Sequence, residues 1–160
     1  MATTNAQAPG GAAQDTSLFG RLFLRYTDEF YLLFRLIFAF IVSLHGAQKA
    51  FQMWGFPPPG SGPPGIVYVA GWIEFISALL IASGVLTRLG AGALCVTMVI
   101  AYFMMHFPNG IAPHIFPAEG GFTATGGEVS ILWFAIAGII GIMGSRKYGL
   151  ERLILKKELL

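Results

Sequence analysis

Charge is the scarcest property of this sequence. Charged side chains make up 11% of its 160 residues, whereas an ordinary soluble domain carries about 25%. Hydrophobic residues account for 55%, and the mean hydropathy is +0.68. This composition excludes an ordinary soluble domain and predicts an integral membrane protein. The formal net charge of +2 is spread over single or paired basic residues, which argues against nucleic-acid binding.

Cysteine is almost absent as well. The one cysteine, Cys95, lies inside an apolar run, so the chain can form neither an internal disulfide nor a Cys-x-x-Cys pair. Intramolecular dithiol chemistry is therefore excluded, including the kind by which four-helix membrane oxidoreductases pass electrons from thiols to quinone.

Long apolar runs are abundant. A membrane-spanning helix needs about 20 residues, and four runs approach or exceed this length, at about residues 29–51, 66–86, 89–107 and 127–145. The short turn at Thr87-Arg88 predicts that the second and third runs form an antiparallel hairpin, whereas Gly- and Pro-rich loops separate the others. We therefore predict an all-α fold, a four-transmembrane-helix antiparallel bundle.

The rest of the chain is predicted to flank this bundle. The expected organisation is a disordered tail at 1–17, an interfacial amphipathic segment or helix extension at 18–28, the membrane domain at 29–145 and an amphipathic tail at 146–160. The lipid bilayer is thus the first expected partner.

The basic residues predict the orientation of the bundle. Near the ends of the spans, Lys49 lies on one side, and the basic residues on the other side are Arg21, Arg25, Arg88, Arg146, Lys147, Arg152, Lys156 and Lys157. Because basic residues near span ends are retained in the cytoplasm, both termini are predicted to be cytoplasmic. The tail at 146–160 should then lie along the inner membrane surface.

Four polar side chains interrupt the apolar runs near the same end of the bundle. They are His45, Glu74, His106 and Glu128. A charged group in the middle of the hydrocarbon costs about 2.5–3.5 kcal/mol even on the most lenient scale, so each needs a partner, a water-filled cavity or a function. Their common level predicts one shared polar site.

The first two spans supply most of this site. His45, Gln48 and Lys49 fall at i, i+3 and i+4 and therefore share one helical face. Glu74 lies about eight residues into the second span, roughly 12 Å deep at the helical rise per residue. We expect it to contact His45 or Lys49, since a carboxyl group without such a partner would take up a proton.

Each of these residues also has a purely structural interpretation. Lys49 could extend along the helix to the membrane surface. Glu128 could complement the N-terminus of the fourth helix without any ligand. His106 could be an ordinary interfacial residue.

Three kinds of ligand fit such a cluster. Two histidines and two carboxylates could bind a divalent metal, but their spacing matches no ligand signature. Haem held by His45 and His106 is conceivable, although the chain has no haem-attachment motif. A quinone or another small redox molecule fits better, because His and Glu can hydrogen-bond and protonate its carbonyl groups. The rings available to pack against it are Tyr102, Phe75, Phe103 and Trp133.

Four segments carry a resemblance to a known family. They are LHGAQKAF (Leu44–Phe51), GWIEFISALLIASGVLTRLGA (Gly71–Ala91), MVIAYFMMHFPNG (Met98–Gly110) and GGEVSILW (Gly126–Trp133). In this order and at these intervals, the chain resembles the DoxX family of small bacterial membrane proteins over about residues 30–145.

The resemblance implies a four-helix protein of the bacterial inner membrane, related to the DoxD subunit of thiosulfate:quinone oxidoreductase and to DoxX proteins linked with oxidative-stress complexes. The family's motif positions are carried here by His45, Gln48, Lys49, Glu74, Thr87, Arg88, His106 and Glu128. The long Pro-rich first loop and the second loop, which holds His114 and Glu119, depart from a minimal member of the family.

The leading hypothesis is a membrane subunit of a redox system that binds quinone or a small sulfur or oxygen species in the outer leaflet. His45, His106 and Glu74 would be its hydrogen-bonding and proton-transfer groups. The residues that contact the ligand would be Gln48, Lys49, Tyr102 and Glu128. Because the chain contains no electron carrier, redox activity would require a quinone, a further cofactor or other redox subunits. The alternative is a non-catalytic accessory subunit of a larger complex, or of a homo-oligomer, and transport is a weaker third hypothesis.

Overall fold

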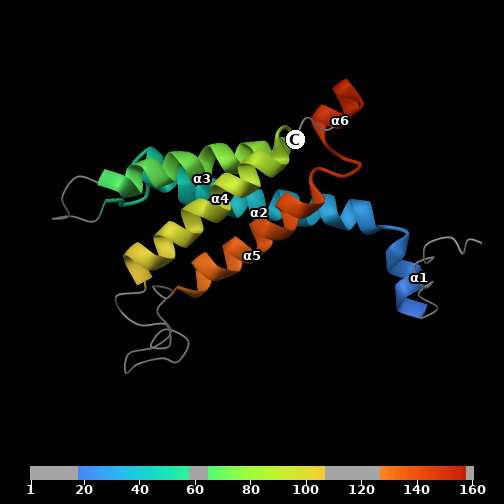
Figure 1. Cartoon of the computed structure of the whole chain (residues 1–160), viewed down its shortest axis with the longest axis horizontal. Coiled ribbons are helices and arrows are strands. Elements are labelled where there is room, and N and C mark those ends of the chain that lie inside the picture. The colour runs from blue at the N-terminus through green and yellow to red at the C-terminus, as the bar shows by residue number, and fades with distance from the viewer. Residues whose placement is uncertain (1–17, 58–64, 107–126, 158–160) are drawn as a thin grey trace, which may run out of the picture.

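The computed structural model describes residues 18–57, 65–106 and 127–157 (Figure 1). All regular secondary structure in these segments is helical, as predicted. The helices are α1 (Leu18–Leu24), α2 (Thr27–Ala50), α3 (Gly65–Ser83), α4 (Thr87–Ala101), the π-helical η1 (Tyr102–His106), α5 (Glu128–Met143) and α6 (Leu150–Leu155). The predictions for the tail at 1–17 and for both long loops lie outside the described residues.

Three of the described helices are long and apolar enough to cross a membrane. They are α2, α3 and the continuous helix formed by α4 and most of η1, Thr87–Met105. The fourth apolar helix, α5, has 16 residues and is shorter than the run from 127 to 145 that the sequence suggested. It ends at Gly144, whose φ of 68° lies outside the helical region that other residues prefer.

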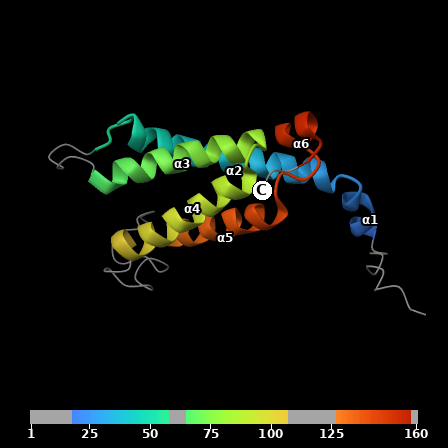
Figure 2. The same ribbon diagram turned by 45° about the horizontal axis from the view of Figure 1, so that its top comes forward.

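The four long helices pack in chain order. α2 lies along α3, α3 along α4 and α4 along α5, and the two views in Figures 1 and 2 agree on this arrangement. The pairs α2–α3 and α4–α5 diverge toward the end at which α2 finishes. The buried core between the helices consists of Phe38, Ala39, Val42, Ala78, Ile81, Ala91, Leu94, Met98, Trp133, Ala137 and Ile140. We name the end that carries α1 and α6 the basic end.

The turn between α3 and α4 begins earlier than predicted. α3 ends at Ser83, Gly84 has a φ of 74° and Leu86 a φ of 48°, and α4 already starts at Thr87. Glycine adopts a positive φ without the steric cost that other residues meet, so Gly84 ends the helix where the apolar pattern alone would continue it. Thr87 therefore belongs to the helix and is 3% exposed.

α2 and α3 approach so closely that two positions require glycine. A Cβ atom on Gly46 would lie 2.5 Å from the backbone nitrogen of Phe75 and 2.9 Å from the carbonyl oxygen of Gly71. A Cβ atom on Gly71 would lie 2.5 Å from the Cβ of Lys49. Small residues at such crossings let helices in lipid pack backbone to backbone.

Gly46→Ala should therefore push α2 away from α3. Because the new methyl group meets backbone atoms, we expect the free energy of unfolding in detergent micelles to fall by about 1–3 kcal/mol. Gly92→Ala in α4 is the matched control, since nothing lies within 4 Å of its added Cβ. That change should be neutral or should stabilise the helix by up to about 1 kcal/mol. Equal losses for the two variants would contradict the close approach.

The chain after α5 folds back onto the start of α2. The Tyr31 hydroxyl donates to the Gly144 carbonyl at 2.8 Å, and Arg35 Nη1 donates to the Ser145 carbonyl at 2.8 Å. Arg35 Nη2 donates to the carbonyl of Tyr148. Arg35 is 1% exposed, so its side chain is enclosed by the fold and does not extend to the membrane surface. We name residues 144–151 the C-terminal latch.

Charged groups reinforce the latch at its rim. Arg146 Nε lies 3.0 Å from Asp28 Oδ1, and the Tyr148 hydroxyl donates to Glu29 Oε1 at 2.7 Å. The pKa of Lys147 is raised, chiefly by its hydrogen bond with Tyr148 and then by the charges of Tyr148 and Glu29. The first part of the predicted surface tail at 146–160 is thus attached to the start of α2.

Candidate ligand site at the end of α2

An ion pair joins α2 and α3 at the end opposite the basic end. Lys49 Nζ donates to both carboxylate oxygens of Glu74, at 2.6 and 2.7 Å. Glu74 is 1% exposed, and the Lys49 side chain is 23% exposed. Of the two contacts that the sequence suggested for Glu74, the structure forms the one with Lys49. The pair satisfies the carboxylate within an apolar helix, where an isolated charge would be costly.

The close approach of α2 and α3 explains why this pair can form. Gly46 precedes Lys49 by about one helical turn, and Gly71 precedes Glu74 by about the same distance. Because neither glycine has a side chain, the two backbones meet there and bring the ammonium and the carboxylate within hydrogen-bonding range. The small residues and the ion pair are therefore parts of the same contact.

His45 faces α5 instead of Glu74. Its ring lies edge-on to the indole of Trp133, with the centroids 4.9 Å apart and the planes at 88°. Trp133 is 8% exposed and also packs edge-on against Phe38 at 6.2 Å. The imidazole itself remains exposed. A side chain predicted to belong to the carboxylate cluster is thus placed about one turn away from it, at the α2–α5 boundary.

A surface hollow of about 230 Å³ lies beside this imidazole. We name it the α2 hollow; it is lined by Leu44, His45, Gln48 and Trp54. It lies at the end of the bundle at which the pairs α2–α3 and α4–α5 diverge.

The turn after α2 brings an aromatic side chain back over the hollow. Gln52 and Trp54 both have a φ of 54°, and the Met53 amide donates to the Gln48 carbonyl at 3.0 Å. This reversal places Trp54 against Gln48 and Leu44. Neither Trp54 nor Leu44 was predicted from the sequence to be a site residue. The only available signal was that Trp54 follows the polar residues of α2 closely in the sequence.

The aromatic residues suggested as ring-packing groups are mostly elsewhere. Phe75 belongs to a cluster with Phe51 at 5.2 Å and Trp72 at 6.4 Å. Tyr102 and Phe103 contact each other in η1 at 5.5 Å, and neither lines the hollow. Clusters of this kind are typical of the aromatic belt at a membrane surface.

The remaining predicted residues are only partly placed. Glu128 begins α5, and its Oε1 atom is buried without a hydrogen-bond partner among the described residues. The side chain of His106 lies outside the described part of the structure. No group of three or more His, Cys, Asp or Glu side chains arranged to hold a metal occurs among the described residues.

Comparison with known proteins supplies the family. A family model described as DoxX matches residues 30–107, which include most of α2 and all of α3, α4 and η1. The chain is also 30% identical over 135 residues to a protein of Haemophilus influenzae described as uncharacterized, and the alignment covers 83% of this chain and 96% of that relative. The chain belongs to the DoxX family. With its apolar helices, this DoxX protein is a multi-pass membrane protein. No solved structure matches it.

Apart from His106, the motif positions expected from the resemblance within residues 30–107 fall at two places in the fold. His45, Gln48, Lys49 and Glu74 gather at the end of α2 and the adjoining part of α3. Thr87 and Arg88 lie at the start of α4, at the basic end, where the Oγ1 atom of Thr87 is buried without a hydrogen-bond partner in the described segments. The candidate ligand site therefore involves the first group.

Proposed function

We propose that this DoxX protein is a subunit of a redox system in a bacterial inner membrane and binds a neutral carbonyl-bearing ring, such as a quinone, in the α2 hollow. The observation that carries the proposal is the exposed imidazole of His45 beside Gln48 in a hollow that also has an indole in its wall. Imidazole and amide groups can donate hydrogen bonds to a carbonyl oxygen, and Trp54 can pack against a ring.

The charge state of the site favours a neutral ligand over an anionic sulfur species. Lys49 is the cation nearest to the hollow on α2, and both of its close contacts go to the Glu74 carboxylate. A ligand anion would have to compete with this buried carboxylate for the ammonium group. A neutral ring needs only the donors of His45 and Gln48, which remain accessible.

In this proposal Glu74 acts through Lys49. The ion pair fixes the last turns of α2 against α3 and so orients the helical face that carries His45 and Gln48. His45 is the group that exchanges a proton with the ligand, since its ring is exposed at the hollow. Because a quinone accepts electrons, the electrons that reduce it would come from a partner subunit.

We further propose that α5 forms a fourth span and that both termini are cytoplasmic. Lipid bilayers accommodate a short span by local thinning at a modest cost. The basic residues around α1 and α6 support this orientation, because such residues are retained on the cytoplasmic side. The α2 hollow would then lie in the outer leaflet.

Binding can be tested by tryptophan fluorescence. In Trp72→Phe protein the remaining indoles are Trp54 and Trp133, one in the wall of the hollow and one against His45. A short-chain quinone should quench them saturably in reconstituted protein, and His45→Ala should weaken the apparent affinity about fivefold, the value of one hydrogen bond. Ser43→Ala is the control, since its hydroxyl donates to Phe40 within the helix and does not line the hollow. Equal affinities in all three proteins would exclude the site.

The second candidate function is that of an accessory subunit. It is favoured by the Lys49–Glu74 pair, which already satisfies both partners and joins two helices without any ligand. Under this proposal His45→Ala leaves quinone binding unchanged, whereas breaking the ion pair lowers stability and the yield of the larger complex. Quinone binding by His45→Ala protein therefore distinguishes the two proposals.

A further inference from the structure

A bend joins α1 to α2 at the basic end. The Tyr26 amide donates to the Phe23 carbonyl at 3.0 Å, and the Thr27 hydroxyl donates to the Leu24 carbonyl at 2.9 Å. The rings of Phe23 and Phe30 meet edge-on across the bend at 6.0 Å. Figures 1 and 2 show α1 turned away from the axis of α2. The bend is thus a hydrogen-bonded turn with an aromatic contact on its inside.

The inside of this bend holds a second hollow, of about 440 Å³. It is lined by Gly20, Phe23, Leu24, Thr27 and Phe30, and we name it the elbow hollow. Its wall is mainly apolar, and Phe23 and Phe30 are 50% and 53% exposed. Ligand sites of this size commonly bind an apolar group with a few polar groups at the rim. Arg25 is exposed in the turn itself, directly after α1.

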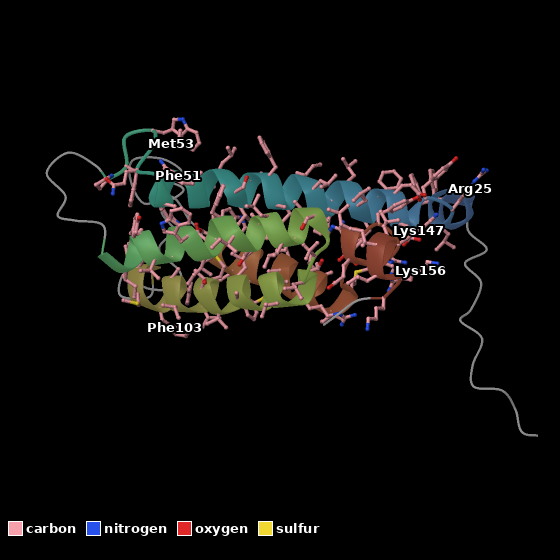
Figure 3. The ribbon with its side chains drawn as sticks, turned by 90° about the horizontal axis from the view of Figure 1, so that it is seen from above. Arg25, Phe51, Met53, Phe103, Lys147 and Lys156 are labelled. Atoms are coloured by element: carbon pink, nitrogen blue, oxygen red, sulfur yellow. The ribbon has the colours of Figure 1, made fainter. Side chains whose placement is uncertain are left out.

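The surface around the elbow hollow carries positive charge. The acidic side chains described at this end are each engaged or buried: Asp28 pairs with Arg146, Glu29 accepts from Tyr148, and Glu151 is 4% exposed. Apart from Glu29, the exposed charged side chains described at this end are cationic, namely Arg25, Arg88, Lys147, Arg152, Lys156 and Lys157. Figure 3 shows Arg25, Lys147 and Lys156 together at this end, away from Phe51 and Phe103.

We propose that the elbow hollow binds one anionic phospholipid. An acyl chain lies between α1 and the first turns of α2, against Phe23 and Phe30, and the phosphate group lies at the rim near Arg25. A lipid fits better than a soluble acidic protein because apolar and cationic side chains alternate here: Phe19 is 70% exposed and Leu24 is 59% exposed on the short helix that precedes Arg25. The proposal is independent of the α2 hollow.

The test is native mass spectrometry of the full-length protein in a detergent that preserves bound lipid. With equal amounts of phosphatidylglycerol and phosphatidylcholine of the same chain length, one phosphatidylglycerol should be retained preferentially. Arg25→Gln should weaken that binding about fivefold, the usual effect of one cation at an anionic surface. Glycerol phosphate, which has the headgroup charge without acyl chains, should not displace the lipid.

Two variants separate a site from diffuse attraction. Arg88→Gln removes an exposed cation of the same end from the first turn of α4, and it should leave the retained lipid unchanged. Gly20→Leu fills the hollow without removing charge, and it should reduce retention while helicity by circular dichroism stays normal. Equal retention of the two phospholipids, equal effects of Arg25→Gln and Arg88→Gln, or full retention in Gly20→Leu would each overturn the proposal.

Discussion

Lys49→Met should be among the most destabilising single substitutions in this protein. It leaves the Glu74 carboxylate 1% exposed and without the ammonium group that now contacts both of its oxygens. Removing one partner of a buried ion pair typically costs about 3–5 kcal/mol, because the remaining charge is neither hydrated nor paired. The measurement is the free energy of unfolding in mixed micelles, followed by far-ultraviolet circular dichroism.

The order of effects distinguishes this explanation from a general loss of packing. Glu74→Gln should cost less, about 1–3 kcal/mol, because the Lys49 side chain is 23% exposed and can extend toward the membrane surface. The double variant Lys49→Met with Glu74→Met should recover much of the loss, since apolar pairs often replace buried ion pairs without penalty. A larger loss for Glu74→Gln than for Lys49→Met would show that the ammonium, rather than the carboxylate, depends on the pair.

Arg35→Ala is expected to release the C-terminal latch. The guanidinium is 1% exposed and donates to the carbonyls of Ser145 and Tyr148. Two hydrogen bonds from a charged group are together worth about 3 kcal/mol or more, and the loss should fall mainly on residues 144–151. Hydrogen exchange should therefore accelerate at these residues, whereas the amides in the middle of α3 and α4 should remain protected.

Two milder variants should lose less stability than Arg35→Ala. Tyr31→Phe removes only the hydrogen bond to the Gly144 carbonyl and should cost about 1 kcal/mol. Arg35→Lys keeps the charge but lacks the planar fork that can reach two carbonyls at once, so it should lie between Tyr31→Phe and Arg35→Ala. If the exchange rates of residues 144–151 do not respond to Arg35→Ala, the latch is held by its other contacts, such as those of Arg146 with Asp28 and Tyr148 with Glu29.

Membership of the DoxX family and the helical character of the chain could be predicted from the sequence. Apolar runs of about 20 residues require helices, because a helix satisfies its backbone hydrogen bonds internally where no water is available. The pairing of Glu74 was also predictable to within two candidates, since a carboxylate at that depth needs a cationic or hydrogen-bonding partner from the adjoining helix. These inferences depend only on local composition and on the cost of burying charge.

The choice between those two candidates depended on tertiary structure. Lys49 and His45 lie four residues apart on α2, so helical spacing places both on one broad face. The backbone contact at Gly46 and Gly71 turns Lys49 toward Glu74 and leaves His45 against Trp133. The orientation of α2 about its own axis depends on which side chains fit between the two helices. A single sequence does not contain that information.

The role of Arg35 and the two hollows likewise appeared only in the folded chain. Arg35 lies near the end of a span, where an arginine side chain can extend to the membrane surface, yet it donates to carbonyls more than 100 positions away. Helices, spans and the need for a charge partner follow from the free energy of placing each residue in lipid, which is local. The latch and both hollows follow from relative helix length, crossing and chain reversal, which are properties of the packed whole.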